Sequence, residues 1–241
     1  HRDEISAFLS ELCDLRVVWG GDETIARLRA VPLNPHAAER AFASKRAISV
    51  FSVATYFATR DDSRNELASR MASDILPFAQ MACSSPHALY WIGTPEAARE
   101  AMHDFGNRLQ IAMTAKTGGH DLAGAVRRLN YAFGAVAAGR ADIVQHQPAT
   151  TQLYVGSPER AESVDVCGAG LLTHTYAPNI RTVCTYLQRY HQTITYFGLT
   201  DIECAELSVL AGSKGVDRIV AAGQALNFGP YWDGYSLWDD F

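Results

Sequence analysis

One cysteine of this chain has a setting that suits nucleophilic chemistry. Cys83 is followed by two small polar residues, Ser84 and Ser85, within the segment FAQMACSSPHALYW at residues 78–91. An apolar helical pattern precedes this segment, and Pro86 and a short strand-like run follow the serines. We expect the loop to be open to a substrate, so that a thiolate could attack a carbonyl carbon. The alternative is a buried thiol, because free cysteine is among the most buried residue types.

The other cysteines do not suggest metal or disulfide chemistry. Cys13, Cys184 and Cys204 lie in periodic apolar segments that we expect to be helical, whereas Cys167 lies beside glycines and is less easily explained. The five cysteines are odd in number and widely spaced, without a CxxC pair or a Cys/His cluster at zinc spacing. We therefore expect free thiols, no metal site and a reducing, cytoplasmic location.

A base or acid for the thiol would have to come from elsewhere in the chain. His36 lies in a loop and His120 follows two glycines, and each could activate a thiol or donate a proton. For each of them a solvated imidazole is the alternative. Glu162 lies in a polar connection with Glu159 and Asp165, which could supply a carboxylate or form a solvated turn.

Strand-like and helical segments alternate along the chain. The expected strands are residues 16–19, 47–54, 87–92, 141–144, 152–155, 171–175, 193–197 and 216–221. The expected helices are residues 4–15, 22–31, 60–76, 94–116, 121–139, 179–191 and 200–214, with Thr94, Asp121 and Thr200 as N-caps. This order predicts an α/β fold with an open, mostly parallel sheet and flanking helices. In such sheets, ligands bind beyond the carboxyl ends of the strands.

A glycine pair joins the first expected strand to the helix that follows it. Gly20 and Gly21 let a cofactor approach the backbone at a helix N-terminus, which we expect Asp22 to cap. A plain turn is the alternative, since the chain has neither a GxGxxG nor a GxxxxGK[ST] motif. Residues 32–44 are expected to form a loop.

Composition excludes some classes of protein. Of 241 residues, 48% are hydrophobic and 20% charged, which is typical of a globular protein with a full core. The formal charge of -5 argues against a non-specific nucleic-acid binder. No apolar run approaches the roughly 20 residues needed to span a bilayer. The first residues, HRDEISAF, lack Met and the features of a signal peptide, so we expect a processed product, an excised domain or a partial chain.

Several segments resemble a known family. AQMACSSPHALYW resembles the nucleophile segment of the aldehyde dehydrogenase superfamily, and Gln80 and Cys83 match its Gln-x-x-Cys run. Three further stretches are similar to the LuxC-type long-chain acyl-CoA reductases, the fatty acid reductases of bacterial bioluminescence. They are VVWGGDETI (17–25), YLQRYHQTITYFG (186–198) and GVDRIVAAGQALNFGPYWDGYSL (215–237). The resemblance covers nearly the whole chain and is weakest at residues 100–170.

The resemblance implies a two-domain enzyme of roughly twice this length. Residues 1–44 would be the end of the nicotinamide-cofactor domain, and residues 45–241 the thiol-bearing catalytic α/β domain with its C-terminal tail. Cys83 would take an acyl group from acyl-CoA or an acyl-carrier thioester, and hydride from NADPH would reduce it to an aldehyde. The family's hydrolytic relatives activate water with a Glu in an E-L-G-G strand. The expected strand AISVFSVA has no carboxylate, which favours acyl reduction over aldehyde oxidation.

The resemblance also implies roles for other residues. Gly20 and Gly21 would line the nicotinamide side of the cofactor site, and His36 would assist proton transfer. Glu162 is our choice for the carboxylate that contacts the cofactor ribose, although the usual E-x-F-G-P pattern is absent. Homo-oligomers and an acyl-donor protein partner both remain open.

Two other classes of function compete with this one. A cysteine acyltransferase or thioesterase would need a His beside the thiol and no nicotinamide. A non-catalytic domain, kept for assembly through the aromatic and acidic tail at residues 231–241, would need neither.

Overall fold

The computed structural model describes residues 3–118 and 121–239, which form two compact units. The second unit comprises Arg46–Asn227, and the first comprises the described residues up to Lys45 together with those from Phe228 onward. By its contacts the tail groups with the N-terminal residues, whereas the resemblance implies a domain of residues 45–241 that includes it. The reason is a local contact: the Tyr235 ring packs edge-on against Phe42 and lies under the Arg40 guanidinium.

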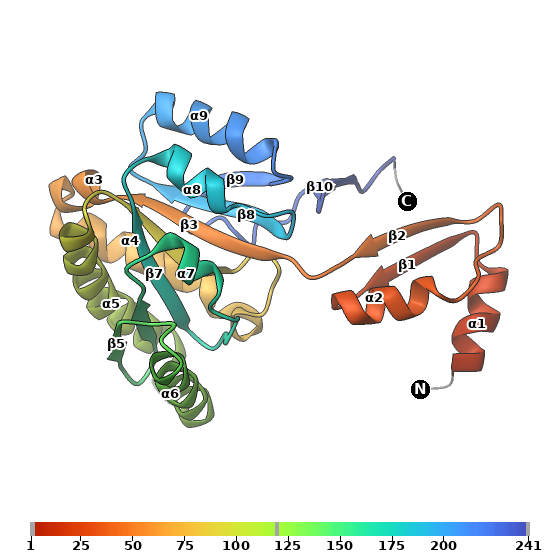
Figure 1. The fold of residues 1–241 in the computed structure, drawn as a ribbon, viewed down its shortest axis with the longest axis horizontal. Coiled ribbons are helices and arrows are strands. Elements are labelled where there is room, and N and C mark those ends of the chain that lie inside the picture. Colours follow the sequence, from red (N-terminus) through yellow and green to blue (C-terminus); the bar gives the residue numbers. More distant parts are fainter. Residues whose placement is uncertain (1–2, 119–120, 240–241) are drawn as a thin grey trace. The chain divides into compact units, whose positions relative to one another are not determined.

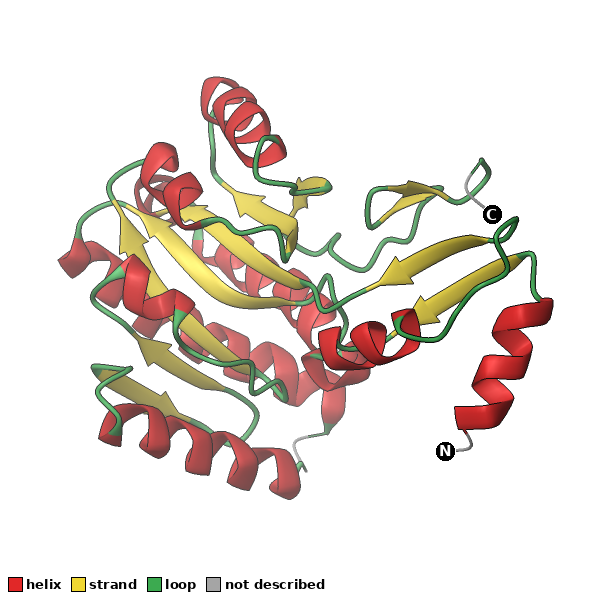
Figure 2. Cartoon of the chain, turned by 45° about the vertical axis from the view of Figure 1, so that its right-hand side comes forward, coloured by secondary structure: helices red, strands yellow, loops and turns green. Residues whose placement is uncertain are grey.

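The second unit is built on a seven-stranded sheet with the order β5-β6-β7-β4-β3-β8-β9 (Figure 2). All neighbouring strands are parallel except β5 and β6, which confirms the expected open, mostly parallel α/β sheet. The strands are β3 (Arg46–Ser52), β4 (Pro86–Ile92), β5 (Ile143–His146), β6 (Thr151–Tyr154), β7 (Leu171–Ala177), β8 (His191–Phe197) and β9 (Arg218–Ala221).

Helices cover both faces of this sheet (Figure 1). Because side chains alternate along a strand, Phe51 and Trp91 point to one face and Ile48 and Tyr90 to the other. The first face packs on α3 (Val53–Ala58), α4 (Asp61–Ile75) and α5 (Pro95–Thr117). The second packs on α6 (Leu122–Ala137), α7 (Pro158–Glu162), α8 (Ile180–Tyr186) and α9 (Asp201–Gly212). None of the described helices combines the length and hydropathy that a membrane-spanning segment needs.

The expected helix starts are mostly confirmed. The side chains of Thr94, Asp121 and Thr200 each accept a backbone N–H of the first turn that follows, and Glu203 completes a capping box with Thr200. The expected extent of residues 179–191 was wrong, because α8 ends at Tyr186 and a turn returns the chain into β8.

The first unit holds a second, smaller α/β arrangement. It contains α1 (Asp3–Leu12), β1 (Leu15–Trp19), α2 (Asp22–Arg29) and β2 (Ala38–Phe42), with β1 and β2 parallel, and the hairpin β10 (Tyr231–Trp232) and β11 (Tyr235–Ser236). The expected loop at residues 32–44 was wrong in part, since it contains β2. The charged residues of β2 do not have the apolar pattern of a strand. In the structure Glu39 forms ion pairs with Arg16 and Arg29, which compensate its charge.

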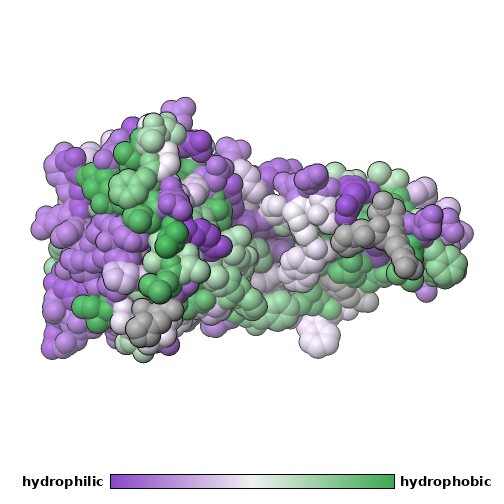
Figure 3. Space-filling model, turned by 90° about the horizontal axis from the view of Figure 1, so that it is seen from below, coloured by the Kyte–Doolittle hydropathy of each residue, from purple (hydrophilic) through white to green (hydrophobic). Residues whose placement is uncertain are grey.

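Helix α1 has the apolar face that its spacing predicts, but the described residues leave it largely uncovered. Its four apolar side chains are between 49% and 65% exposed: Ile5, Phe8, Leu9 and Leu12. Figure 3 shows apolar surface over the part of the molecule that holds α1 and β1. Cys13 follows the last residue of this helix rather than lying on it.

Candidate active site

Cys83 lies at the amino-terminal edge of the large sheet. It precedes β4 by three residues, and the pairing of Ala47 with Pro86 and of Arg46 with His191 brings the starts of β3, β4 and β8 together. This edge is opposite to the carboxyl ends of the strands, beyond which ligands bind in open parallel sheets. The reason is its place in the chain, since a loop that leads into a strand lies at the strand's amino end.

The loop around Cys83 is folded inward rather than open. Ser84 and Ser85 are fully buried, whereas Cys83 is half-buried. The Ser85 hydroxyl donates to the carbonyl of Asp74 on α4, at 2.8 Å. The expectation that both serines make the loop accessible was therefore wrong: they anchor it, and the thiol remains its partly exposed member.

Gln80 fixes the other side of this loop. Its buried amide nitrogen Nε2 donates to the carbonyls of Pro86 at 2.7 Å and Leu171 at 3.0 Å. Its Oε1 accepts the Gly170 N–H at 2.8 Å. The glutamine of the Gln-x-x-Cys run thus joins the loop to the starts of both β4 and β7, which gives it a positioning role.

Two left-handed backbone segments meet just before the Cys83 loop. Phe78, Ala79 and Gln80, in the short turn η1 (Pro77–Gln80), have φ values of 54°, 50° and 66°. Residues 168–170 also have positive φ, and Ala169 N–H donates to the Ala79 carbonyl at 2.8 Å. Left-handed conformations are costly for residues other than glycine and cluster at functional sites. The surrounding hydrogen bonds hold this strained turn directly before Cys83.

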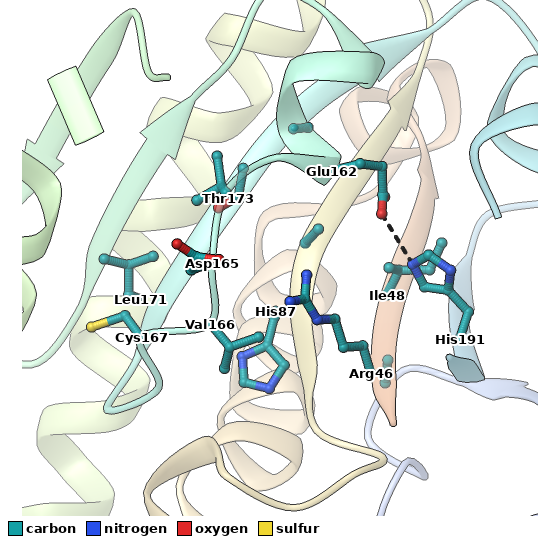
Figure 4. A pocket seen from close by; sticks show the side chains of 14 residues that line it. Arg46, Ile48, His87, Glu162, Asp165, Val166, Cys167, Leu171, Thr173 and His191 are labelled. Atoms are coloured by element: carbon teal, nitrogen blue, oxygen red, sulfur yellow. Dashed lines mark ion pairs between the residues drawn. The ribbon is translucent and has the colours of Figure 1, made fainter. Parts of the chain in front are cut away.

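A pocket with several ionisable side chains lies at the same edge of the sheet (Figure 4). The ionisable or nucleophilic side chains that line it are Arg46, His87, Glu162, Asp165, Cys167 and His191. Glu162 accepts hydrogen bonds from the hydroxyls of Tyr90 and Tyr190, and its carboxylate lies 3.4 Å from His191 Nε2. The polar connection that contains Glu162 is therefore not a solvated turn at this residue.

The electrostatics of the pocket favour an ionised Glu162. Burial by itself raises the pKa of Glu162, but hydrogen bonds from His191, Tyr90 and Tyr190 outweigh burial and lower it below its ordinary value. His191 Nδ1 accepts the Gln188 N–H at 2.8 Å, so the ring proton lies on Nε2, toward the carboxylate. Glu162 can thus remain an anion inside the fold.

His87 is a functional candidate that the sequence did not indicate. Burial, together with the positive charge of Arg46, lowers the pKa of His87 to about 4. Its Nδ1 is buried without a hydrogen-bond partner among the described residues. Figure 4 shows the His87 ring beside the Arg46 side chain, which reaches it from the neighbouring strand. An uncharged imidazole with an unused nitrogen can bind a polar group of a ligand. In the sequence, the feature that could have indicated His87 is its position four residues after Cys83.

The remaining candidates belong to the first unit. Gly20 and Gly21 connect β1 to α2, and Gly21, not Asp22, is the N-cap residue of α2. Asp22 instead accepts the Ser44 N–H. His36 is exposed in the turn before β2. Cys83 and Glu162 belong to the second unit, and His120 lies outside the described residues.

The match to a family model decides the relationship of this chain to known proteins. A model described as acyl-CoA reductase (LuxC) matches residues 1–241. The chain belongs to the acyl-CoA reductase (LuxC) family. No curated protein matches the sequence closely enough to count as a relative.

Solved structures share the fold of this acyl-CoA reductase family member. Lactaldehyde dehydrogenase from Escherichia coli is 12% identical, with a TM-score of 0.59, over 90% of this chain and 48% of that one. Methylmalonate-semialdehyde dehydrogenase (DddC) from Oceanimonas doudoroffii is 12% identical, with a TM-score of 0.62, over 92% and 48%. Delta-pyrroline-5-carboxylate dehydrogenase from Mycobacterium tuberculosis, bound with NAD, is 13% identical, with a TM-score of 0.56, over 86% and 41%. The chain therefore has an aldehyde dehydrogenase-like fold and spans about half the length of these enzymes.

Two strands of this family member bear on whether a carboxylate could activate water: β3 of the large sheet and β2 of the first unit. Strand β3 contains none, as the sequence indicated. Strand β2 contains Glu39, whose oxygens lie 2.6 Å from Arg16 and 2.9 Å from Arg29. A carboxylate engaged by two guanidinium groups is a weak general base.

An apolar cavity adjoins the two left-handed segments. Its volume is about 200 Å³. Its lining combines the ends of α4 and α5 with the left-handed segments described above: Ile75, Leu76, Ala79, Met113, Thr117, Asp121, Ala149, Ala169 and Gly170. Most of these side chains are apolar, so the cavity suits a hydrocarbon group.

Proposed function

We propose that this chain is the thiol-bearing half of an NADPH-dependent oxidoreductase that reduces a fatty acyl thioester to an aldehyde. The family match over the whole chain supports the reaction class. The observation that carries the proposal is the setting of Cys83: a half-buried thiol in a loop held by Gln80 and Ser85. A buried structural cysteine would need neither the anchoring nor the exposure.

The proposed reaction begins with the Cys83 thiolate. It attacks the carbonyl carbon of acyl-CoA or of an acyl-carrier thioester, and the departing thiolate leaves an acyl group on Cys83. The nicotinamide cofactor supplies the hydride that reduces this acyl-enzyme. The resulting thiohemiacetal releases the aldehyde and restores the thiolate of Cys83, with His36 as the candidate for proton transfer. The absence of a carboxylate on β3 supports reduction over hydrolysis.

The residues of the first unit fit one end of a nicotinamide cofactor better than the other. A Cβ atom added at Gly21 would meet only the Ser44 hydroxyl oxygen, at 3.7 Å. The space beside this backbone is therefore open to a ligand. Asp22 and Glu23 in the first turn of α2 would repel a phosphate. Gly20 and Gly21 are therefore proposed for the nicotinamide end, and Glu162 for the ribose. The NAD bound to one structural neighbour supports a cofactor of this class.

The apolar cavity beside Ala79 and Gly170 is our candidate for the acyl chain. We propose a cytoplasmic enzyme whose partner is a long-chain acyl thioester. Further partners of this enzyme could be a second copy of the same chain or a protein that donates the acyl group.

Labelling with radioactive palmitoyl-CoA tests the proposal. Wild type should retain label that Cys83→Ala loses, and NADPH should release that label as aldehyde. Cys167→Ala, which changes another buried thiol, should label like wild type. Release as free acid, or to a second thiol without NADPH, would instead indicate a thioesterase or acyltransferase. No label on Cys83 would contradict a nucleophilic role.

A further inference from the structure

We propose that Arg218 is a positioning residue that holds a positive charge beside the Cys83 thiolate, and that Asp74 joins the elements carrying the two groups. The inference rests on the proposed nucleophilic role of Cys83 and adds a residue to that site. It is carried by a chain of contacts through the interior of the second unit.

Asp74 connects the Cys83 loop to the turn at residues 223–227. Its backbone carbonyl accepts the Ser85 hydroxyl at 2.8 Å, two residues after Cys83. Its carboxylate accepts the N–H groups of Gly223 at 2.6 Å and Ala225 at 2.9 Å. Asp74 is only 1% exposed, so these contacts are shielded from water. One residue of α4 therefore fixes two segments that lie about 140 residues apart in sequence.

Arg218 holds the same turn from β9. Its guanidinium donates to the carbonyls of Ala225 at 3.1 Å and Asn227 at 2.9 Å, with a longer contact to Gln224. Carbonyl oxygens satisfy the N–H donors of the guanidinium but carry no net charge. The positive charge therefore still acts on its surroundings. The turn that binds the guanidinium is also the turn that Asp74 connects to the Cys83 loop.

The charges of the two groups are coupled. Burial lowers the pKa of Arg218, while the negative charges of Cys83 and Asp74 act to raise it. By reciprocity, the guanidinium must favour the thiolate form of Cys83. The Asp74 carboxylate would oppose a thiolate, but two backbone N–H groups face its oxygens. A cation near the thiol is the usual way to make a cysteine reactive at neutral pH.

The test is the pH dependence of Cys83 alkylation by iodoacetamide, followed by mass spectrometry of the peptide that contains Cys83. Arg218→Gln removes the charge but keeps an N–H donor for the turn, and Arg218→Lys keeps the charge. The Gln variant should raise the apparent pKa of Cys83 by about one unit, which lowers alkylation at pH 7 about tenfold. The Lys variant should stay close to wild type.

Equal alkylation profiles for the Gln variant and wild type would overturn the inference. Circular dichroism and urea midpoints of both variants detect a folding defect. If Arg218→Gln unfolds, Arg218→Met, which also removes the charge, replaces it in the comparison with Arg218→Lys, and equal Cys83 profiles for those two variants would then overturn the inference. The alkylation assay needs neither acyl-CoA nor NADPH. A Cys83 that alkylates as expected but never takes an acyl label would thus contradict the proposed function alone.

Discussion

Gln80 and Gly170 are joined by a 2.8 Å hydrogen bond, from the Gly170 N–H to Gln80 Oε1, although 90 residues separate them in sequence. This bond links the turn before the candidate nucleophile to the start of β7. The same side chain donates to the carbonyls of Pro86 and Leu171. The position of Cys83 thus depends on contacts with a distant part of the chain.

Replacing Gln80 should destabilise the second unit. Gln80→Ala leaves the carbonyls of Pro86 and Leu171 and the Gly170 N–H unpaired in the interior, at a cost of about 3 kcal/mol in total. Urea unfolding measures the difference. Gln188→Ala, which changes an exposed glutamine, should alter stability by less than about 0.5 kcal/mol. Similar effects of the two substitutions would contradict this role for Gln80.

Gly170 should not tolerate a side chain. Its φ is +89°, and a Cβ there would lie 2.8 Å from Met113 Cε and 2.9 Å from the Ala149 carbonyl. Gly170→Ala should therefore destabilise by roughly 2 kcal/mol or more. Gly134→Ala is the matched control, because Gly134 lies in α6 with nothing near its Cβ position. That substitution should stabilise the helix by about 0.5 kcal/mol or more. Thermal unfolding of both variants gives the comparison, and a neutral Gly170→Ala would count against the geometry.

Asp74 should make stability depend on pH. Burial is the main cause that raises its pKa from 3.8 to about 6, against the lowering effect of the Gly223 and Ala225 N–H groups. The folded state then binds a proton at Asp74 more tightly than the unfolded state. The resulting contribution to the free energy of unfolding is complete below about pH 4 and is lost as pH rises through about 6. The loss amounts to at most about 3 kcal/mol.

Asp74→Asn removes this titration. The stability of wild type relative to the Asn variant, from urea unfolding at several pH values, should fall between pH 4 and 7. A difference that is constant over this range would contradict a raised pKa for Asp74.

Glu162 should stabilise the edge formed by α7 and β8. Glu162→Ala leaves the hydroxyls of Tyr90 and Tyr190 and the His191 ring without their shared acceptor, for a cost of about 3 kcal/mol. Glu159→Ala removes an exposed carboxylate from the same helix and should cost less than about 0.5 kcal/mol. Guanidinium unfolding distinguishes them. If both variants unfold at the wild-type midpoint, the buried cluster contributes nothing to stability.

Filling the apolar cavity should change which acyl chains react. Leu76→Trp places a bulky ring in the cavity wall, whereas Leu76→Met keeps the side-chain volume almost unchanged. Excluding two methylenes of a long chain would cost about 1.6 kcal/mol, or about tenfold. The measured quantity is the rate of Cys83 acylation by palmitoyl-CoA relative to octanoyl-CoA. The ratio should fall in the Trp variant only, and an unchanged ratio would show that the chain binds elsewhere.

The sequence determined the elements whose signals are local. The capping residues Thr94, Asp121 and Thr200 act within one helical turn, so their residue types were sufficient to find three helix starts. The alternation of strands and helices likewise predicted the parallel sheet, and the stretches at residues 17–25, 186–198 and 215–237 indicated the family that the whole chain matches.

Only the tertiary structure decided which side chains meet. Strand β2 escaped detection because Glu39 is neutralised by arginines 10 and 23 residues away. The burial of Ser84 and Ser85, the cluster around Glu162 and the contacts of Arg218 all depend on partners from other elements. Burial and hydrogen bonding between distant segments leave no local pattern, since they arise only when the strands align. The sequence therefore indicated Cys83 as the candidate nucleophile, and the fold determined what surrounds it.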